Sequence, residues 1–187
     1  MKKFLLLSLS IILAVVGCCG CDAGDSSELE KANASYHIEE QLPNQKIVFI
    51  MTKINYVERF GEGYFIDGEG RRYTFSLDSK QIYERIEQIY KELIDHYEEF
   101  ESTDFMDKEK LKKTAEALYC INPTAEVKEE GKAIIDYAPE ALYGVKKIDG
   151  KEEIVFLKSY SGDSKELDDK YAKMVYKEIG DTWNNVK

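Results

Sequence analysis

The stretch from Lys46 to Val57 constrains the fold most, because its side chains are apolar on both faces of an extended chain. Successive side chains of a strand point to opposite sides of the sheet, so alternate residues define each face. Apolar residues occupy both sets, with Val48, Ile50 and Ile54 on one face and Ile47, Phe49 and Met51 on the other. Such a strand is typical of the centre of a sheet. The sequence therefore predicts a long central strand over residues 46–57.

Two further stretches have the pattern of β-hairpins. Segment 63–70 leads into residues 72–77, in which apolar and polar side chains alternate, the apolar set being Tyr73, Phe75 and Leu77 and the polar set Arg72, Thr74 and Ser76. This alternation predicts a strand with one solvent-exposed face. Residues 142–148 and 153–160 flank Asp149-Gly150, a pair that strongly favours a two-residue hairpin turn. Residues 124–140 are interpreted as a loop that holds one strand or none.

Three segments have the 3.6-residue periodicity of amphipathic helices, over about residues 78–100, 107–121 and 163–180. Asp78 or Ser79 would cap the first, and Pro123 would end the second, because the residue before proline avoids the helical region. A capping box of Asp163 and Glu166 would start the third. Together these segments predict an α+β fold, an antiparallel sheet of about five strands with amphipathic helices packed on one face.

The two hairpins share a short sequence. Ile66-Asp67-Gly68 and Ile148-Asp149-Gly150 each lie at a turn, and a predicted helix follows each hairpin. A duplicated hairpin-and-helix unit would produce this pattern. Turn chemistry would produce it as well, because Asp-Gly recurs in unrelated hairpins.

The N-terminus has the features of an export signal. Lys2 and Lys3 are basic, and the run from Phe4 to Val16 is apolar but too short to span a bilayer comfortably. The residues that follow, Val15-Val16-Gly17-Cys18, resemble the lipobox of bacterial lipoproteins. The resemblance implies cleavage before Cys18 and a lipid anchor on its thiol, at the extracytoplasmic face of the cell membrane. A plain secretory signal would not explain a cysteine at this position.

The chain is predicted to have three parts: a signal peptide (1–17), a lipidated cysteine with a flexible tether (18–44) and one globular domain (45–187). A weak helix within 29–40 is an alternative for part of the tether. Loss of Lys2 and Lys3 with the signal peptide changes the net charge from −10 to −12. Such a chain repels nucleic acid. We therefore expect no nucleic-acid partner, and a membrane contact only through lipid on Cys18.

The hairpin at Gly63–Asp67, and Gly162-Asp163 ahead of a terminal helix with Trp183, resemble small surface lipoproteins of Gram-positive bacteria. The resemblance implies fold and location, and it implies no activity.

Motifs for transition metals, cofactors and nucleophilic catalysis are lacking in the sequence. His96 is the one histidine outside the predicted tether, at the edge of an apolar stripe, and we interpret it as a packing residue. Gly61-x-Gly63 and Gly68-x-Gly70 lead into a strand rather than a helix, so they are hairpin glycines and not a phosphate loop. Cys120 falls away from the apolar face of its helix, which allows an exposed thiol. No cofactor or metal is expected.

Two classes of function remain. The first is a non-catalytic binding or accessory module for a protein, peptide or glycan, and the second is a small extracytoplasmic hydrolase that uses a carboxylate pair. Tyr83, Tyr90 and Tyr97 recur at heptad spacing and would line one edge of the helix predicted over 78–100. Their rings either seal the core or present a ligand-binding surface.

Overall fold

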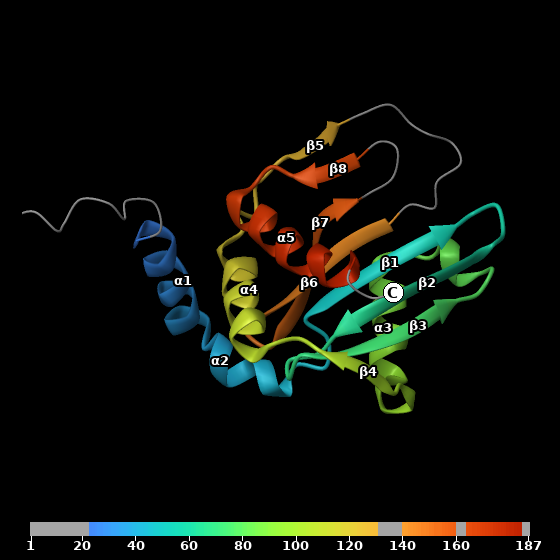
Figure 1. Cartoon of the computed structure of the whole chain (residues 1–187), viewed down its shortest axis with the longest axis horizontal. Coiled ribbons are helices and arrows are strands. Elements are labelled where there is room, and N and C mark those ends of the chain that lie inside the picture. The colour runs from blue at the N-terminus through green and yellow to red at the C-terminus, as the bar shows by residue number, and fades with distance from the viewer. Residues whose placement is uncertain (1–22, 131–139, 160–163, 185–187) are drawn as a thin grey trace, which may run out of the picture.

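One antiparallel sheet of eight strands runs through the part of the chain that this computed structural model describes, residues 23–130, 140–159 and 164–184. The strand order is β4-β3-β2-β1-β6-β7-β8-β5 (Figure 1). The strands are β1 (Phe49–Asn55), β2 (Phe60–Ile66), β3 (Arg71–Leu77), β4 (Ser102–Phe105), β5 (Val127–Glu130), β6 (Glu140–Ile148), β7 (Lys151–Ser159) and β8 (Ser164–Leu167). The helices are α1 (Ala23–Tyr36), α2 (Ile38–Gln41), α3 (Ile86–Asp95), α4 (Lys108–Cys120) and α5 (Lys170–Asn184), with 3-10 turns η1 (Leu42–Asn44), η2 (Gln81–Tyr83) and η3 (Tyr97–Glu99).

The central strand predicted from its two apolar faces is confirmed as β1. It pairs with β2 on one side and with β6 on the other, so that Thr52 lies between Gly63 and Ala141. Alternate β1 side chains enter two different buried clusters, Phe49 on one face of the sheet and Ile50 on the other. The strand is therefore buried from both sides.

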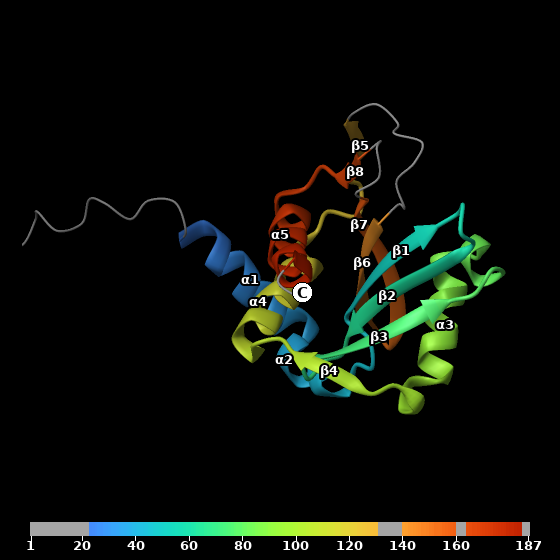
Figure 2. The same ribbon diagram turned by 45° about the vertical axis from the view of Figure 1, so that its right-hand side comes forward.

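Helices cover both faces of the sheet, which corrects the prediction that they pack on one face (Figure 2). On the face that carries Phe49, α4 and α5 pack against the strands, and α1 packs outside them against α4. On the face that carries Ile50, η2 and α3 cover the strands. A strand with two apolar faces needs an apolar partner on each side, and this requirement decides the layering.

The sheet has eight strands rather than about five, because β4, β5 and β8 have only four residues each. Their side chains are mostly charged or exposed, so they lack the apolar alternation by which a strand is recognised in a sequence. The coarser prediction of an α+β fold with an antiparallel sheet is confirmed.

The helix predicted over residues 78–100 is interrupted. Glu84 and Arg85 are extended and separate η2 from α3, and η3 follows the helix. The N–H of Arg85 donates to the side chain of Gln88, which starts the helix anew. Ile82 and Ile89 nevertheless share one buried cluster. The apolar stripe is therefore real, but the backbone that carries it is not one helix.

The last helix, α5, begins at Lys170, later than the sequence predicts. Glu166 of the predicted capping box lies in β8, and Asp163 is outside the described residues. Asp169 caps the helix instead, because its carboxylate accepts hydrogen bonds from two N–H groups of the first turn. The helix also continues through Gly180, where the sequence predicts its end.

The two hairpin-and-helix units differ in turn and in layer. The β6–β7 turn is the predicted two-residue turn, with positive φ at Asp149 (51°) and Gly150 (77°), whereas the β2–β3 turn spans residues 67–70. The helices that follow, α3 and α5, lie on opposite faces of the sheet. β2 and β6 are both antiparallel to β1 and therefore run parallel to each other, so a two-fold axis along β1 would also place the two helices on opposite faces.

The flexible tether predicted for 18–44 is corrected over residues 23–44, which form α1, α2 and η1. Leu29 and Ala32 of α1, Ile38 of α2 and Leu42 of η1 are buried in the cluster that includes α4 and α5. These apolar residues are too few to form a sustained helical periodicity in the sequence. The segment is therefore predicted as a linker from the sequence alone.

Polar contacts also hold α1 and α2 in place. The Glu28 carboxylate bonds to Tyr171 and pairs with Lys170 at 3.2 Å, while Glu39 of α2 pairs with Lys112 of α4 at 2.7 Å. Residues 23–44 therefore belong to the folded domain and not to a flexible linker.

Gly144 of β6 is the point of closest approach between the sheet and α4. A Cβ atom at this position would lie 2.4 Å from Cδ1 of Leu118, which is fully buried. We expect Gly144→Ala to lower the free energy of unfolding by about 1–3 kcal/mol through overpacking. The same change in a Leu118→Ala background should cost less, because the truncated side chain leaves room. Denaturant melts of the four variants form a double-mutant cycle, and strict additivity would contradict this packing.

Candidate functional site

A groove of about 680 Å³ runs along the uncovered part of strand β3. β4 pairs with β3 only at residues 71–73, so among the described residues the outer edge from Thr74 to Leu77 has no partner strand. Both faces of this edge contribute to the groove, which we call the β3-edge groove. Its lining residues are Glu62, Gly63, Tyr64, Arg72, Thr74, Phe75, Ser76 and Phe100.

Arg72 is the distinctive side chain of the β3-edge groove, because it is charged and only 7% exposed. Its guanidinium lies over the ring of Tyr64, with 5.5 Å to the ring centroid. The closest carboxylate, Asp104 on β4, is 3.6 Å from Nη2 and is half exposed. The Nε atom has no hydrogen-bond partner among the described residues. A buried cation whose described counter-ion is 3.6 Å away is costly, so an anion in the groove would stabilise this side chain.

The wet face of β3 forms the floor of the groove beside Arg72. Thr74 and Ser76 are exposed and present hydroxyl groups, whereas Phe75 and Leu77 point to the opposite face and pack in the cluster with α3. Phe100, just before β4, packs edge-on against Phe65, with 5.3 Å between ring centroids. The groove therefore combines one buried positive charge, two hydroxyls and an aromatic wall.

A buried carboxylate, Asp67, fixes the start of β3. Its two oxygens accept hydrogen bonds from the N–H groups of Glu69 and Arg71, from Arg71 Nε at 2.7 Å, and from the hydroxyls of Tyr73 and Tyr97. Burial is the main cause that raises the pKa of Tyr73 and Tyr97, so both keep their protons and act as donors. With five donors satisfied, Asp67 has a structural role and does not offer itself to a ligand.

The three tyrosines predicted to share one helix edge lie in different surroundings, because the helix is interrupted. Tyr83 in η2 is 65% exposed. Its ring lies tilted against the ring of Tyr56, with 5.9 Å between the ring centroids. Tyr90 in α3 is buried, and burial together with Glu152 raises its pKa. Tyr97 in η3 bonds to Asp67. They do not form one surface, and their predicted role in ligand binding stays a prediction.

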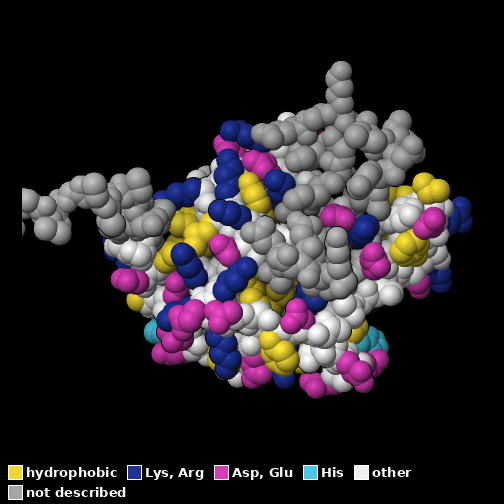
Figure 3. Space-filling model, in the orientation of Figure 1, with side chains coloured by type: hydrophobic (Ala, Val, Ile, Leu, Met, Phe, Trp, Pro, Cys, Tyr) yellow, Lys and Arg dark blue, Asp and Glu magenta, His cyan; other side chains and the backbone are white. Residues whose placement is uncertain are grey.

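Tyr83 belongs to an exposed apolar tip at the turn between β1 and β2. Hydrophobic side chains gather over the tips of these two strands (Figure 3), and the exposed residues are Tyr56, Val57, Phe60 and Tyr83. The tip carries no buried polar group comparable to Arg72.

A second groove, of about 490 Å³, lies between α1 and α4 and is lined mostly by charged residues. Its charges form ion pairs, including Lys110 with Glu178 at 3.2 Å and Lys112 with Glu39 at 2.7 Å. Glu116 is buried here, and burial raises its pKa. Hydrolysis by a carboxylate pair needs a facing acid and base. Lysines hold Glu39 and Glu178, while the negative charges of Glu30 and Glu109 help to raise the pKa of Glu116.

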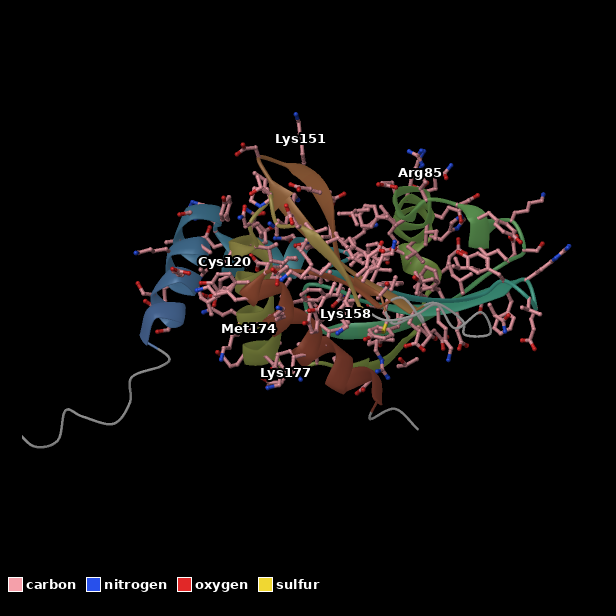
Figure 4. The ribbon with its side chains drawn as sticks, turned by 90° about the horizontal axis from the view of Figure 1, so that it is seen from above. Arg85, Cys120, Lys151, Lys158, Met174 and Lys177 are labelled. Atoms are coloured by element: carbon pink, nitrogen blue, oxygen red, sulfur yellow. The ribbon has the colours of Figure 1, made fainter. Side chains whose placement is uncertain are left out.

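Cys120 is half buried rather than exposed. Its thiol donates to the backbone carbonyl of Glu28 at 3.6 Å, because α1 covers this side of α4 (Figure 4). Burial raises the pKa of the thiol, which disfavours the thiolate needed for nucleophilic attack.

His96 is exposed rather than packed. It caps the C-terminal end of α3, outside the helix, and bonds to Glu99 at 2.8 Å, which raises its pKa. Among the described residues no three His, Cys, Asp or Glu side chains are grouped to hold a metal ion.

The sequence placed Arg72, Thr74 and Ser76 on one wet face but gave no reason to single them out. The alternation of β3 shows which residues share a face, but it does not show that β4 leaves the edge after Tyr73. That information lies in the pairing of strands far apart in the sequence.

Comparisons with protein-family models, with curated proteins and with solved structures find no match. Within the described ranges, no helix is both long and apolar enough to cross a bilayer.

Glu116→Gln tests whether this buried carboxylate is a cost to the fold. Because its pKa is raised above the usual 4.5, the folded state binds the proton more tightly, and stability falls as pH rises through that interval. Glu116→Gln should raise the free energy of unfolding at pH 7 and have no such effect below pH 4.5. Denaturant melts at both pH values measure this, with Glu101→Gln, an exposed site outside this groove, as control. A loss of stability at pH 7 would show instead that the charge of Glu116 is well compensated.

Proposed function

We propose that the protein is a lipoprotein anchored at the extracytoplasmic face of the cell membrane, where it acts as a non-catalytic binding module for a protein, peptide or glycan. The β3-edge groove is the proposed binding site. The observation that carries the proposal is the largely buried guanidinium of Arg72, which lines an open groove and whose ion-pair partner among the described residues, Asp104, lies 3.6 Å away.

The anchor is supported by the apolar run Phe4–Val16 and by the Val-Val-Gly-Cys sequence that ends at Cys18. Two acyl chains on one cysteine give stable membrane attachment, whereas a single chain binds marginally. Five Cα–Cα steps separate Cys18 from Ala23, the first described residue of α1, so this stretch would span at most about 18 Å. The anchored domain would therefore lie close to the membrane surface.

The position of the groove is compatible with such an anchor. α1 lies at one end of the molecule, and β3 lies across the sheet from it in both ribbon views (Figures 1 and 2). A domain held by its N-terminus would thus keep the β3 edge accessible to a partner.

Binding is favoured over hydrolysis by the arrangement of charges. Lysines pair with two carboxylates of the groove that holds Glu116, those of Glu39 and Glu178, whereas the guanidinium of Arg72 lines the other groove. A buried guanidinium recognises carboxylate or phosphate groups, and alone it provides neither a nucleophile nor a general base.

The anchor is tested by Cys18→Ala, because acylation requires the thiol of this residue. We expect mass spectrometry of membrane-derived protein to find an acylated N-terminal Cys18 in the wild-type chain and none in the variant. Cys21→Ala is the matched control and should leave the modification unchanged. Recovery of unlipidated mature wild-type chain from the medium would contradict the anchor.

The binding site is tested by a photoreactive amino acid placed at Thr74 or, as control, at the exposed turn residue Lys151. Irradiation of the cells that make the protein should give a discrete adduct from position 74 and none from 151. Arg72→Gln should reduce the adduct at position 74, because the buried charge that holds the ligand is lost. Equal adducts at both positions, or no effect of Arg72→Gln, would show that the groove is not the site.

A further inference from the structure

The geometry points to the kind of ligand that the β3-edge groove takes: an extended peptide segment that adds to β3 as an antiparallel strand and places a carboxylate against Arg72. This inference rests on the proposed function and specifies its ligand.

The backbone of β3 presents to the groove hydrogen-bonding groups that have no partner strand within residues 23–130, 140–159 and 164–184. The carbonyl of Arg72 accepts a bond from the Thr103 side chain at 3.3 Å, so it points toward the β4 side. Backbone direction alternates along a strand, and the continuous pairing with β2 shows that β3 is regular through this stretch. The N–H and C=O groups of Thr74 and Ser76 therefore point to the same side, where β4 no longer covers them.

The irregularity beside this edge belongs to β4 and not to β3. Tyr73 and Arg72 are consecutive in β3, while their partners Ser102 and Asp104 are separated by Thr103. A bulge of this kind bends the strand that carries it. β4 thus turns away and leaves the edge of β3 straight and open.

The two edges of the sheet differ in how they are protected. The opposite edge strand, β5, carries charged residues Lys128 and Glu129, and charges on an edge discourage pairing with another chain. The open part of β3 is Thr-Phe-Ser-Leu, which has high β-propensity and no charge. An unprotected edge is suited to strand addition.

The position of Arg72 selects a ligand with a carboxylate at its end. An antiparallel segment beside residues 74–77 runs toward β4, which occupies the edge from Tyr73 onward. The C-terminal end of the segment must therefore stop near Arg72. A guanidinium binds a carboxylate through charge-assisted hydrogen bonds, and Arg72 lines the groove at this end. Its Nε atom is itself buried, so the terminal Nη atoms would have to make these bonds. The carboxylate is either that of the chain terminus or that of a final Asp or Glu.

The same geometry specifies the pattern of the remaining side chains. Side chains of an added strand alternate between the two faces of the sheet. On one face they would meet Thr74 and Ser76, and on the other they would meet Phe75 and Phe100. Polar and apolar residues should therefore alternate in the ligand.

The test uses pools of randomised hexapeptides labelled with fluorescein at the N-terminus, and it measures anisotropy with the purified full chain. Four pools differ only at the backbone or terminus: a free C-terminal acid, a C-terminal amide, an amide with Asp fixed at the last position, and an acid with alternate backbone nitrogens methylated. We expect the acid and Asp-amide pools to bind at least about tenfold more tightly than the plain amide pool. The plain amide has no carboxylate at its end and therefore lacks the charge-assisted pair with Arg72. The methylated pool should lose binding because it cannot pair as a strand.

Three variants identify the groups of the protein that bind. Arg72→Gln should lower binding of the acid pool to that of the amide pool. Ser76→Pro removes an outward N–H and should abolish binding, whereas Ser76→Ala keeps the N–H and should bind like the wild type. Thermal melts establish that each variant folds, and the methylated peptides test strand pairing independently of any variant.

Several results would overturn the inference: equal binding of acid and amide pools, equal binding of the methylated pool, binding unaffected by Arg72→Gln, or no binding by any pool. Concentration-dependent dimerisation that Ser76→Pro abolishes would also overturn it, because a second copy would then occupy the edge. If the adduct at position 74 persists and still depends on Arg72, the proposed function stands even where the peptide inference fails.

Discussion

The buried carboxylate of Asp67 is the interaction on which the open edge depends. It bonds to Arg71 and Tyr73 of β3 and to Tyr97 of η3, and so it ties the β2–β3 turn to the segment that leads into β4. A carboxylate can be buried only when its acceptor sites are filled, and five donors fill them here. The path of the chain after η3 is thereby fixed, and with it the point at which β4 joins and leaves β3.

That point determines the chemistry of the groove. β4 covers Arg72 and brings Asp104 near it, but at 3.6 Å the carboxylate does not form a close bidentate pair. The guanidinium thus lies, without a close counter-ion among the described residues, at the boundary between the covered and the uncovered edge. Strand addition and carboxylate binding thus arise from one feature, the short reach of β4. A lipid on Cys18 would hold the domain by its opposite end, with the edge turned outward.

Sequence patterns predicted the long helices and strands, and they did not predict the elements that tertiary contacts define. The two apolar faces of β1, the Asp149-Gly150 turn and helix α4 were predicted, because each is encoded by neighbouring residues. Four-residue strands, the break before α3 and the packing of α1 were not, because they depend on partners distant in the sequence. For the site, the alternation of β3 grouped Arg72 with Thr74 and Ser76. Its burial could not be predicted, because the strand order across a sheet is not a local property.

Residue-resolved amide hydrogen exchange tests whether the edge of β3 beyond Tyr73 is open, that is, without a partner strand. In the free protein the N–H groups of Thr74 and Ser76 should exchange fast, because they point away from β2 and have no partner strand. The N–H groups of Phe75 and Leu77 point toward β2 and should exchange slowly. Slow exchange at all four residues would contradict the account, since it would mean that another segment or a second copy already pairs with this edge.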